Sequence, residues 1–249
     1  TVGGNLAATT DDNSGVINLG TLAVDGTVAL QTNGSGNATV VNDAGLDFAA
    51  STVGGNLVGT ATTGNLTDSG ALTIAGTSSF TTSARDATIA LNDTSNAFAG
   101  AVTLSTAGSS GNALIDNGTT ALDIAASSVG GDLTLTSGNA SGITDSGTVT
   151  VGGNLAATTD ANNGLINMGT LAVDGTVALT THGNGAATVV NDAGLNFAAS
   201  TVGGNLVATA TTGNMTDSGA LAITGTTTLT TSANNATIAL DTTTNAFTG

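Results

Sequence analysis

The feature that most constrains this chain is a gapless internal repeat. Residues 1–100 align with residues 150–249 at a constant offset in number, so that VGGNLAATTD at Val2 returns at Val151. The chain therefore holds one long repeat, residues 1–149, and a partial second copy, residues 150–249. Repeats of this kind cannot bury their apolar residues alone and gain a core by stacking on their neighbours. We expect one continuous repeat domain over residues 1–249.

A shorter period lies inside the long repeat. An apolar residue, any residue and then a glycine precede a further strand-like run at Gly4, Gly26, Gly55, Gly76, Gly100, Gly131, Gly153, Gly175, Gly204, Gly225 and Gly249. The spacings between successive glycines in the first long repeat are 22, 29, 21, 24, 31 and again 22. If each spacing is one coil of a solenoid, the chain has ten coils, with six in each long repeat.

Apolar residues alternate with small or polar ones around each of these glycines. Leu22, Val24, Val28 and Leu30 would lie on one face, which is the period of a half-buried strand. The second coil offers strands at residues 28–32, 38–42 and 46–50. The absence of proline suits a backbone that must donate hydrogen bonds to both neighbouring coils. The predicted fold is all-β: a right-handed parallel β-helix (β-solenoid) of about ten coils of three short strands.

The charge of the chain is strongly one-sided. It has 17 acidic residues, all aspartate, and a single basic residue, Arg85, for a net charge of −16. Such a chain lacks the cations that displace counterions from phosphates, so we expect no nucleic-acid partner. No apolar run approaches the ~20 residues that span a bilayer, so we expect no membrane insertion. The absence of cysteine excludes a disulfide framework.

Asparagine or aspartate follows an apolar residue and one further residue at a recurring place in the middle strand. The positions are Asn18, Asn42, Asp68, Asp116, Asp145, Asn167, Asn191 and Asp217, with Leu91 and Leu240 departing from the pattern. We expect one column of side chains that hydrogen-bond along the stack and close a corner.

The alternative for this column is calcium binding. Asp116 and Asp145 would then be adjacent, and two charges ~5 Å apart repel by about 3 kcal/mol at an effective dielectric of 20, which oxygen-bound calcium would relieve. The EF-hand loop and the calcium-binding nonapeptide repeat are both absent from the sequence. We therefore assign no metal-ligand residues and expect no cofactor, with calcium as the open alternative.

No residue is predicted to be catalytic or cofactor-binding, and we expect the protein not to be an enzyme. The single histidine, His182, and Arg85 each follow a strand, in THGNG and SARDA, and the other copy has Asn33 and Asn234 at the matching positions. A catalytic group would be expected in both copies. The Gly-Gly pairs lack the helix and the lysine of a phosphate-binding loop.

Two threonine-rich segments, residues 60–65 and 226–232, suggest an exposed threonine array on a strand face. Such an array would suit a binding module for glycan or ice, although unequal coil lengths would interrupt it. All five aromatic residues are phenylalanines at positions expected in the core: Phe48, Phe80, Phe98, Phe197 and Phe247.

The GGNL and GTVAL units, with their Asn/Asp-Ser-Gly turns, resemble the β-helical repeats of filamentous-haemagglutinin-like exoproteins, which are large bacterial surface adhesins. The resemblance covers essentially the whole chain and implies secretion, an extracellular cell-surface location and adhesion. We expect a non-catalytic structural or adhesive segment of a long secreted surface protein, forming a rod or extracellular filament. The expected partners are further copies or continuing coils of a longer chain, and a cell-surface glycan or receptor.

Overall fold

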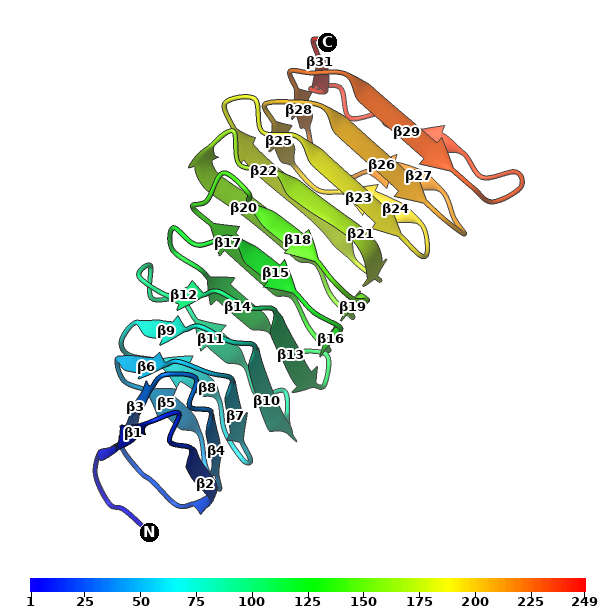
Figure 1. The fold of residues 1–249 in the computed structure, drawn as a ribbon. Helices are drawn as coiled ribbons and strands as arrows, with labels where there is room; N and C mark the ends of the chain where they lie inside the picture. The colour runs from blue at the N-terminus through cyan, green and yellow to red at the C-terminus, as the bar shows by residue number, and fades with distance from the viewer.

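The computed structural model describes all residues 1–249, and every regular element in it is a β-strand. The strands form two sheets, of 18 and 13 strands, and their pairings are parallel throughout. Each coil passes from one sheet to the other and back, and lies on the coil before it (Figure 1). The all-β parallel solenoid is confirmed. No helix long and apolar enough to cross a membrane is present.

The 18-stranded sheet contains β1 (Leu6–Asn13), β3 (Thr27–Asn33), β5 (Leu46–Phe48), β6 (Ser51–Val53), β8 (Leu66–Asp68), β9 (Leu72–Ile74), β11 (Ile89–Leu91), β12 (Ala97–Phe98), β14 (Ala113–Asp116), β17 (Leu133–Ser137), β20 (Leu155–Asn162), β22 (Thr176–His182), β24 (Leu195–Phe197), β25 (Ser200–Val202), β27 (Met215–Asp217), β28 (Leu221–Ile223), β30 (Ile238–Ala239) and β31 (Ala246–Phe247).

The 13-stranded sheet contains β2 (Ile17–Leu22), β4 (Ala38–Asn42), β7 (Leu57–Ala61), β10 (Ser78–Arg85), β13 (Val102–Ala107), β15 (Leu122–Ile124), β16 (Ser127–Val129), β18 (Ile143–Asp145), β19 (Val149–Val151), β21 (Ile166–Val173), β23 (Ala187–Asn191), β26 (Leu206–Ala210) and β29 (Thr227–Thr231).

The solenoid has about 12 coils, more than the ten that the glycine spacings predict. Leu6 and Leu155 hold the same place in the two copies of the long repeat. Between them the 18-stranded sheet steps through β1, β3, β5, β8, β11, β14, β17 and β20. The long repeat therefore contains seven coils and not six. At a strand spacing of about 4.8 Å, the whole rod is roughly 55 Å long.

The miscount comes from the two longest spacings, Gly26 to Gly55 and Gly100 to Gly131. The N–H of Gly26 donates to the carbonyl of Gly4, but the N–H of Gly55 donates to Gly36 and not to Gly26. Gly55 therefore lies at the opposite corner of the coil from Gly26, and the chain between them covers one and a half coils. In keeping with this, Val24 pairs with Val2 whereas Val53 pairs with Ile74, so Val24 and Val53 are not stacked.

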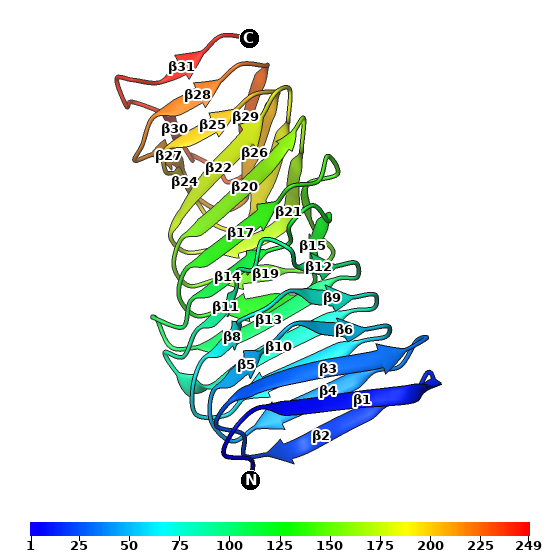
Figure 2. The same cartoon turned by 90° about the vertical axis from the view of Figure 1, so that its left-hand side faces the viewer.

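The rod winds in a right-handed sense. In Figure 2 the strands of the 18-stranded sheet face the viewer and run from left to right while the chain climbs from the N-terminus to the C-terminus. This is the handedness expected for a parallel crossover, because twisted strands pack back onto their own sheet only in that sense.

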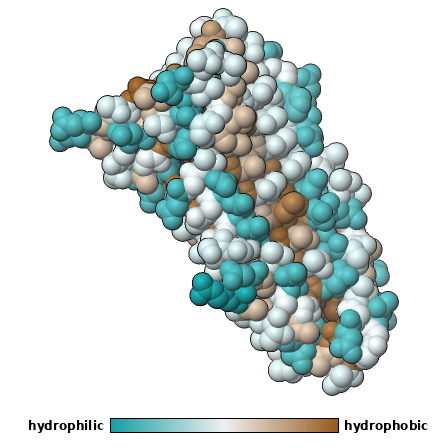
Figure 3. Space-filling model, turned by 180° about the vertical axis from the view of Figure 1, so that it is seen from behind, coloured by the Kyte–Doolittle hydropathy of each residue, from teal (hydrophilic) through white to brown (hydrophobic).

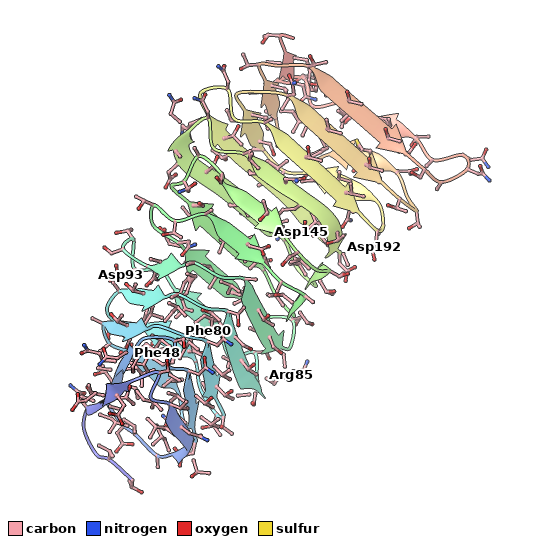
Figure 4. All side chains as sticks on the ribbon, viewed as in Figure 1. Phe48, Phe80, Arg85, Asp93, Asp145 and Asp192 are labelled. Atoms are coloured by element: carbon pink, nitrogen blue, oxygen red, sulfur yellow. The ribbon has the colours of Figure 1, made fainter.

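The interior is one cluster of 49 buried apolar side chains. The predicted alternation is confirmed, since Val24, Val28 and Leu30 are each at most 2% exposed. Edge-to-face ring contacts join Phe48 to Phe80 at 6.3 Å and Phe80 to Phe98 at 5.6 Å between centroids. Figure 4 shows Phe48 and Phe80 among the strands of the first coils.

The two sides of a coil differ. In most coils one side is a single strand, and the other is split by a bend into two short strands. The split side belongs to the 18-stranded sheet from β5 to β12, to the 13-stranded sheet from β15 to β19, and to the 18-stranded sheet again from β24 to β31. The split side therefore changes sheets along the rod.

Candidate functional site

The eight Asn and Asp positions do not form the single column that the sequence predicts. Asp116 ends β14 in the 18-stranded sheet and pairs with Thr136. Asp145 ends β18 in the 13-stranded sheet and pairs with Ile124. The expected adjacency of Asp116 and Asp145 is therefore wrong. One and a half coils of chain separate the two residues, so they fall on opposite sides of the rod.

Three buried asparagines close the split side where it ends: Asn42, Asn117 and Asn191, each at most 1% exposed. The Asn117 side chain accepts the N–H of Phe98 at 2.7 Å and donates to its carbonyl at 3.1 Å, in the coil below, that is, one coil nearer the N-terminus. Asn42 and Asn191 bond Val24 and Val173 in the same way, at 2.8–3.0 Å. In each case the side-chain amide makes the two hydrogen bonds that a strand of the coil above would otherwise make to the bonded residue.

The sequence pattern finds two of these three asparagines. It selects Asn42 and Asn191, but in the middle copy it selects Asp116, the residue before Asn117. The pattern fails there because it follows the apolar spacing, whereas burial of the side chain decides which polar residue enters the ladder.

Three buried serines open the split side on the opposite sheet, and the sequence analysis missed them: Ser51, Ser127 and Ser200. The hydroxyl of Ser127 accepts the N–H of Leu104 at 2.9 Å, below the bend, and donates to the carbonyl of Ala125 at 2.8 Å. Ser51 and Ser200 do the same for Leu30 and Leu179, both at 3.0 Å. The serine hydroxyl thus accepts a hydrogen bond from an N–H group that the bend leaves without a backbone partner.

Each asparagine and the serine that follows it form what we call a side switch. The three side switches are NDAGLDFAAS (42–51), NGTTALDIAAS (117–127) and NDAGLNFAAS (191–200). Along the sequence, successive side switches are separated by half the length of a long repeat. Half of a long repeat is three and a half coils, so each switch lies on the side opposite to the previous one. The AAS triplet is the sequence signal that could have found them.

A second set of aspartates binds the backbone of the coil above: Asp68, Asp145 and Asp217. Asp68 accepts the N–H groups of Asn92 and Asp93 at 2.9 and 3.3 Å, and Asp145 accepts those of Gly169 and Thr170 at 2.9 and 2.7 Å. Asp217 accepts the side-chain amide of Asn245 at 2.6 Å. These carboxylates hold a loop of the next coil and do not face one another.

Asp217 has a pKa that departs from its ordinary value. Burial acts to raise the pKa of the Asp217 carboxyl, but hydrogen bonds from the Asn245 side chain and from the N–H groups of Asp241 and Thr242 outweigh it and lower the pKa below 3.8. Those donors stabilise the ionised form. The charge of Asp217 is therefore part of the contact between its coil and the coil above.

The pKa of Asp116 departs from its ordinary value in the opposite direction. Burial raises the pKa of the Asp116 carboxyl above 3.8, against a lowering hydrogen bond from the N–H of Gly118. The negative charges of Asp160, Asp68 and Asp93 add to the rise. No three Asp or His side chains gather in a group that could hold a metal ion.

A further set of asparagines, each of which follows a glycine at a corner of a coil, was also missed. The side-chain oxygen of each accepts the N–H of the residue at the same corner in the coil above, at 2.7–3.0 Å: Asn5, Asn37, Asn56, Asn112, Asn154 and Asn205, with Asp132 in the same role. A glycine precedes each of them because, inside the rod, the corners of successive coils are in close backbone contact, which leaves no room for a side chain. A Cβ on Gly55 would meet the carbonyls of Ser35 and Gly36.

His182 and Arg85 each lie at the end of a strand. His182 ends β22, and its Nδ1 is 2.8 Å from the carbonyl of Thr159, a contact that the Asn33 amide makes to Thr10 at 3.1 Å in the first copy. Arg85 ends β10 with a side chain that is 81% exposed and 3.5 Å from Asp86. Figure 4 shows Arg85 at the margin of the rod.

Hydroxyl side chains stack on the outer faces of both sheets. In the 13-stranded sheet, paired positions in successive coils run Thr60, Thr81, Ser105, Ser128 and Thr150. In the 18-stranded sheet they run Thr136, Thr158, Thr180 and Thr201. On the face seen from behind, hydrophobic residues form small patches among pale and hydrophilic ones (Figure 3).

Shallow grooves lie beside the side switches that begin at Asn42 and Asn191. They measure about 340 and 330 Å³ and occupy equivalent places in the two copies of the long repeat. Asp25 and Asp47 line the first, and Asp174 and Asn196 line the second. The buried Oδ1 atoms of Asp47 and Asn196 lack a hydrogen-bond partner. The second groove has Asn196 at the position of Asp47. The first groove therefore contains two carboxylates, and the second contains only that of Asp174.

The chain matches a family described as repeats of unknown function over residues 35–105, 110–167 and 184–249. Each match begins seven positions before a side switch, at 35, 110 and 184 against 42, 117 and 191. The family unit is thus the half-repeat of three and a half coils. No curated protein and no solved structure matches the chain.

Proposed function

We propose that this chain, which belongs to the family of repeats of unknown function DUF5649, is a non-catalytic structural or adhesive segment of a long secreted surface protein. In this role the solenoid acts as a stiff rod or as part of an extracellular filament. The observation that carries the proposal is the unbroken parallel ladder, which runs from β1 to β31 around one apolar cluster.

The interactions between coils favour a mechanical role. The corner asparagines, the side switches and the aspartates that hold loops all bond from one coil to the next. Polar side chains that enter the ladder at every coil fix the register of each coil on its neighbour, which gives a rod of defined shape. A stiff spacer needs this property.

The exterior fits exposure to solvent. With 17 aspartates and one arginine, the rod carries a net charge of −16, and like charge along its length opposes non-specific side-by-side aggregation. An acidic, hydroxyl-rich surface of this kind suits a protein displayed outside the cell.

The test is to locate the native protein. Antibodies raised against residues 1–249 should label intact cells that make the protein, and electron micrographs should show the label on thin unbranched fibres or stalks. Cells that lack the gene are the control. Label that appears only after the cells are permeabilised, or only on compact particles, contradicts the proposal.

A second candidate is a binding module for glycan or ice on one strand face, favoured by the stacked hydroxyls of Thr60, Thr81 and Ser105. Substitution of Thr81 by lysine would place a charge in the middle of this row without touching the core. If this function holds, T81K reduces retention on a glycan array or inhibition of ice growth, whereas N18A, on an exposed edge position, leaves both unchanged.

A further inference from the structure

Four asparagines of the chain are followed directly by a glycine: Asn33, Asn117, Asn163 and Asn184. An Asn-Gly pair is the sequence most prone to deamidation, a reaction in which the side-chain amide is lost without an enzyme. The attacking group is the backbone nitrogen of the glycine, which is accessible because glycine has no Cβ. The structure distinguishes the four pairs, because the reaction needs a glycine nitrogen that is exposed and free of hydrogen bonds.

The pair at Asn117 is protected by its side switch. The Asn117 side chain is 0% exposed, and its amide is bonded to Phe98 and to the carbonyl of Ala121. The N–H of Gly118 donates to the carboxylate of Asp116 at 2.9 Å. Neither the side-chain amide nor the glycine nitrogen is free to react, so this asparagine can persist in the ladder although a glycine follows it.

The pairs at Asn163 and Asn184 combine an exposed asparagine with a protected glycine. Gly164 and Gly185 are both buried. The N–H of each donates to the carbonyl three residues before it, at 3.0 and 3.1 Å. The glycine nitrogen can attack only after this turn opens, and a buried N–H that leaves its carbonyl finds no water to replace it. Both pairs are therefore expected to react slowly in the folded chain.

The pair at Asn33 differs from the other three at its glycine. Gly34 is exposed, and its N–H donates no hydrogen bond in the structure. Asn33 is exposed as well, and its amide is held by bonds of 3.1 and 3.3 Å to the carbonyls of Thr10 and Asp11. Because the amide lies at the surface, water replaces these bonds when the side chain turns toward the glycine nitrogen.

We propose that Asn33 is a modification site of this chain, at which spontaneous deamidation takes place. The Gly34 nitrogen attacks Cγ of the Asn33 side chain and forms a bond to it. The bond from Cγ to Nδ2 breaks, and the Nδ2 group leaves as ammonia with the proton of the Gly34 nitrogen. Water then opens the resulting five-membered succinimide at one of its two carbonyls and leaves aspartate or isoaspartate. The reaction is independent of the role of the rod proposed above.

The modification changes the contact between two coils at this corner. A carboxylate at position 33 cannot donate to the carbonyls of Thr10 and Asp11, and β1 already carries the charges of Asp11 and Asp12 beside it. Isoaspartate also adds one carbon to the main chain at the end of β3. Deamidation should therefore weaken the pairing of β1 with β3 where Asn13 lies beside Asn33.

The second copy of the long repeat provides a matched comparison. His182 and Gly183 stand there in place of Asn33 and Gly34. Gly183 is exposed, its N–H donates no hydrogen bond, and its φ of +63° is close to the +60° of Gly34. His182 contacts the strand below as Asn33 does, through its Nδ1 at 2.8 Å from the carbonyl of Thr159. The reactive backbone is thus present in both copies, and only the side-chain amide is missing from the second.

The first experiment compares the four pairs within one protein. The wild type is incubated at slightly alkaline pH, and peptide mapping by mass spectrometry follows the conversion of amide to acid at each asparagine. In the folded chain Asn33 should convert faster than the other three by about tenfold or more, which corresponds to the cost of opening one buried hydrogen bond. In urea that unfolds the chain, the four pairs should convert at similar rates, because every glycine nitrogen is then free.

The second experiment exchanges the residues of the two copies. N33H gives the first copy the side chain of the second, and it should abolish conversion at position 33 while the other three rates stay as in the wild type. H182N gives the second copy the side chain of the first, and it should create a new site at position 182 that converts at a rate close to that of Asn33. Circular dichroism confirms that both variants are folded.

Three outcomes overturn the proposal. Equal conversion of the three exposed pairs in the folded chain would show that hydrogen bonding of the glycine nitrogen does not control the reaction. Faster conversion at Asn163 or Asn184 than at Asn33 would place the site elsewhere. A folded H182N chain that stays unconverted at position 182 would show that an exposed, unbonded glycine nitrogen is not sufficient.

Discussion

Phe80 lies one coil above Gly59 in the 13-stranded sheet, and the two residues are paired in register. A Cβ on Gly59 would come within 2.9 Å of the Phe48 ring and 3.3 Å of the Phe80 ring. In the second copy the same two positions hold Ala208 and Leu229, again in register. The first copy combines the smaller Gly59 with the larger Phe80, and the second copy combines the larger Ala208 with the smaller Leu229. This exchange of volume is expected where two side chains share one space.

This pairing predicts a compensating pair of substitutions. G59A alone should lower the free energy of unfolding by about 1–3 kcal/mol because it overpacks the site. G59A/F80L copies the second repeat and should recover most of that loss, with a coupling energy of about 1 kcal/mol or more. Urea denaturation of the wild type, both single variants and the double variant gives the coupling. Additive effects would show that the rings do not share the space with position 59.

The side switches predict that replacing a buried asparagine lowers the free energy of unfolding much more than replacing an exposed one. N117A leaves the N–H and carbonyl of Phe98 and the carbonyl of Ala121 without their side-chain partner. Each buried group left unsatisfied costs about 1–3 kcal/mol, so we expect a loss of about 3 kcal/mol or more. N18A, at an exposed position, should change stability by less than about 0.5 kcal/mol. Equal effects in urea denaturation would mean that Asn117 does not close the ladder.

The raised pKa of Asp116 predicts that D116N stabilises the fold at neutral pH. A carboxyl whose pKa is higher in the folded chain contributes most below its ordinary value of 3.8, and this contribution is lost as the pH rises through the folded pKa. Asparagine keeps the acceptor for the N–H of Gly118 and removes the charge. The gain from D116N should therefore be present at neutral pH and vanish well below pH 3.8, as measured by urea midpoints across this range. A gain independent of pH would argue against a shifted pKa.

The lowered pKa of Asp217 predicts the opposite sign. A carboxyl whose pKa is lower in the folded chain stabilises it above 3.8, and this stabilisation is lost as the pH falls through the folded pKa. D217N should be less stable than the wild type at neutral pH and equal to it at low pH. The D116N and D217N titrations serve as controls for each other, since a general effect of charge would give both variants the same sign.

The strands could be predicted from the sequence because alternation is a local property. Val28 and Leu30 face inward whatever lies above them, and unlike residues on neighbouring positions of a strand must face opposite sides. The parallel stacking follows from repetition, since each coil offers its neighbour the same pattern. Both predictions are confirmed.

The number of coils could not be predicted from the glycine spacings. A glycine is required wherever two corners touch, and Gly26 and Gly55 satisfy this requirement at opposite corners. A spacing therefore cannot distinguish one coil from one and a half. The same ambiguity placed Asp116 and Asp145 side by side when they lie on opposite sides of the rod.

By itself, the sequence determined that this chain forms parallel strands with a continuous apolar interior, because burial follows directly from the order of apolar and polar residues along each strand. Only the tertiary structure decided which side of the rod each strand occupies and why Asn117 and Ser127 are buried. Their role depends on which backbone groups in the coil below lack a partner, and that is decided by the stacking of Asn117 on Phe98 and of Ser127 on Leu104, contacts between residues one coil apart in the chain.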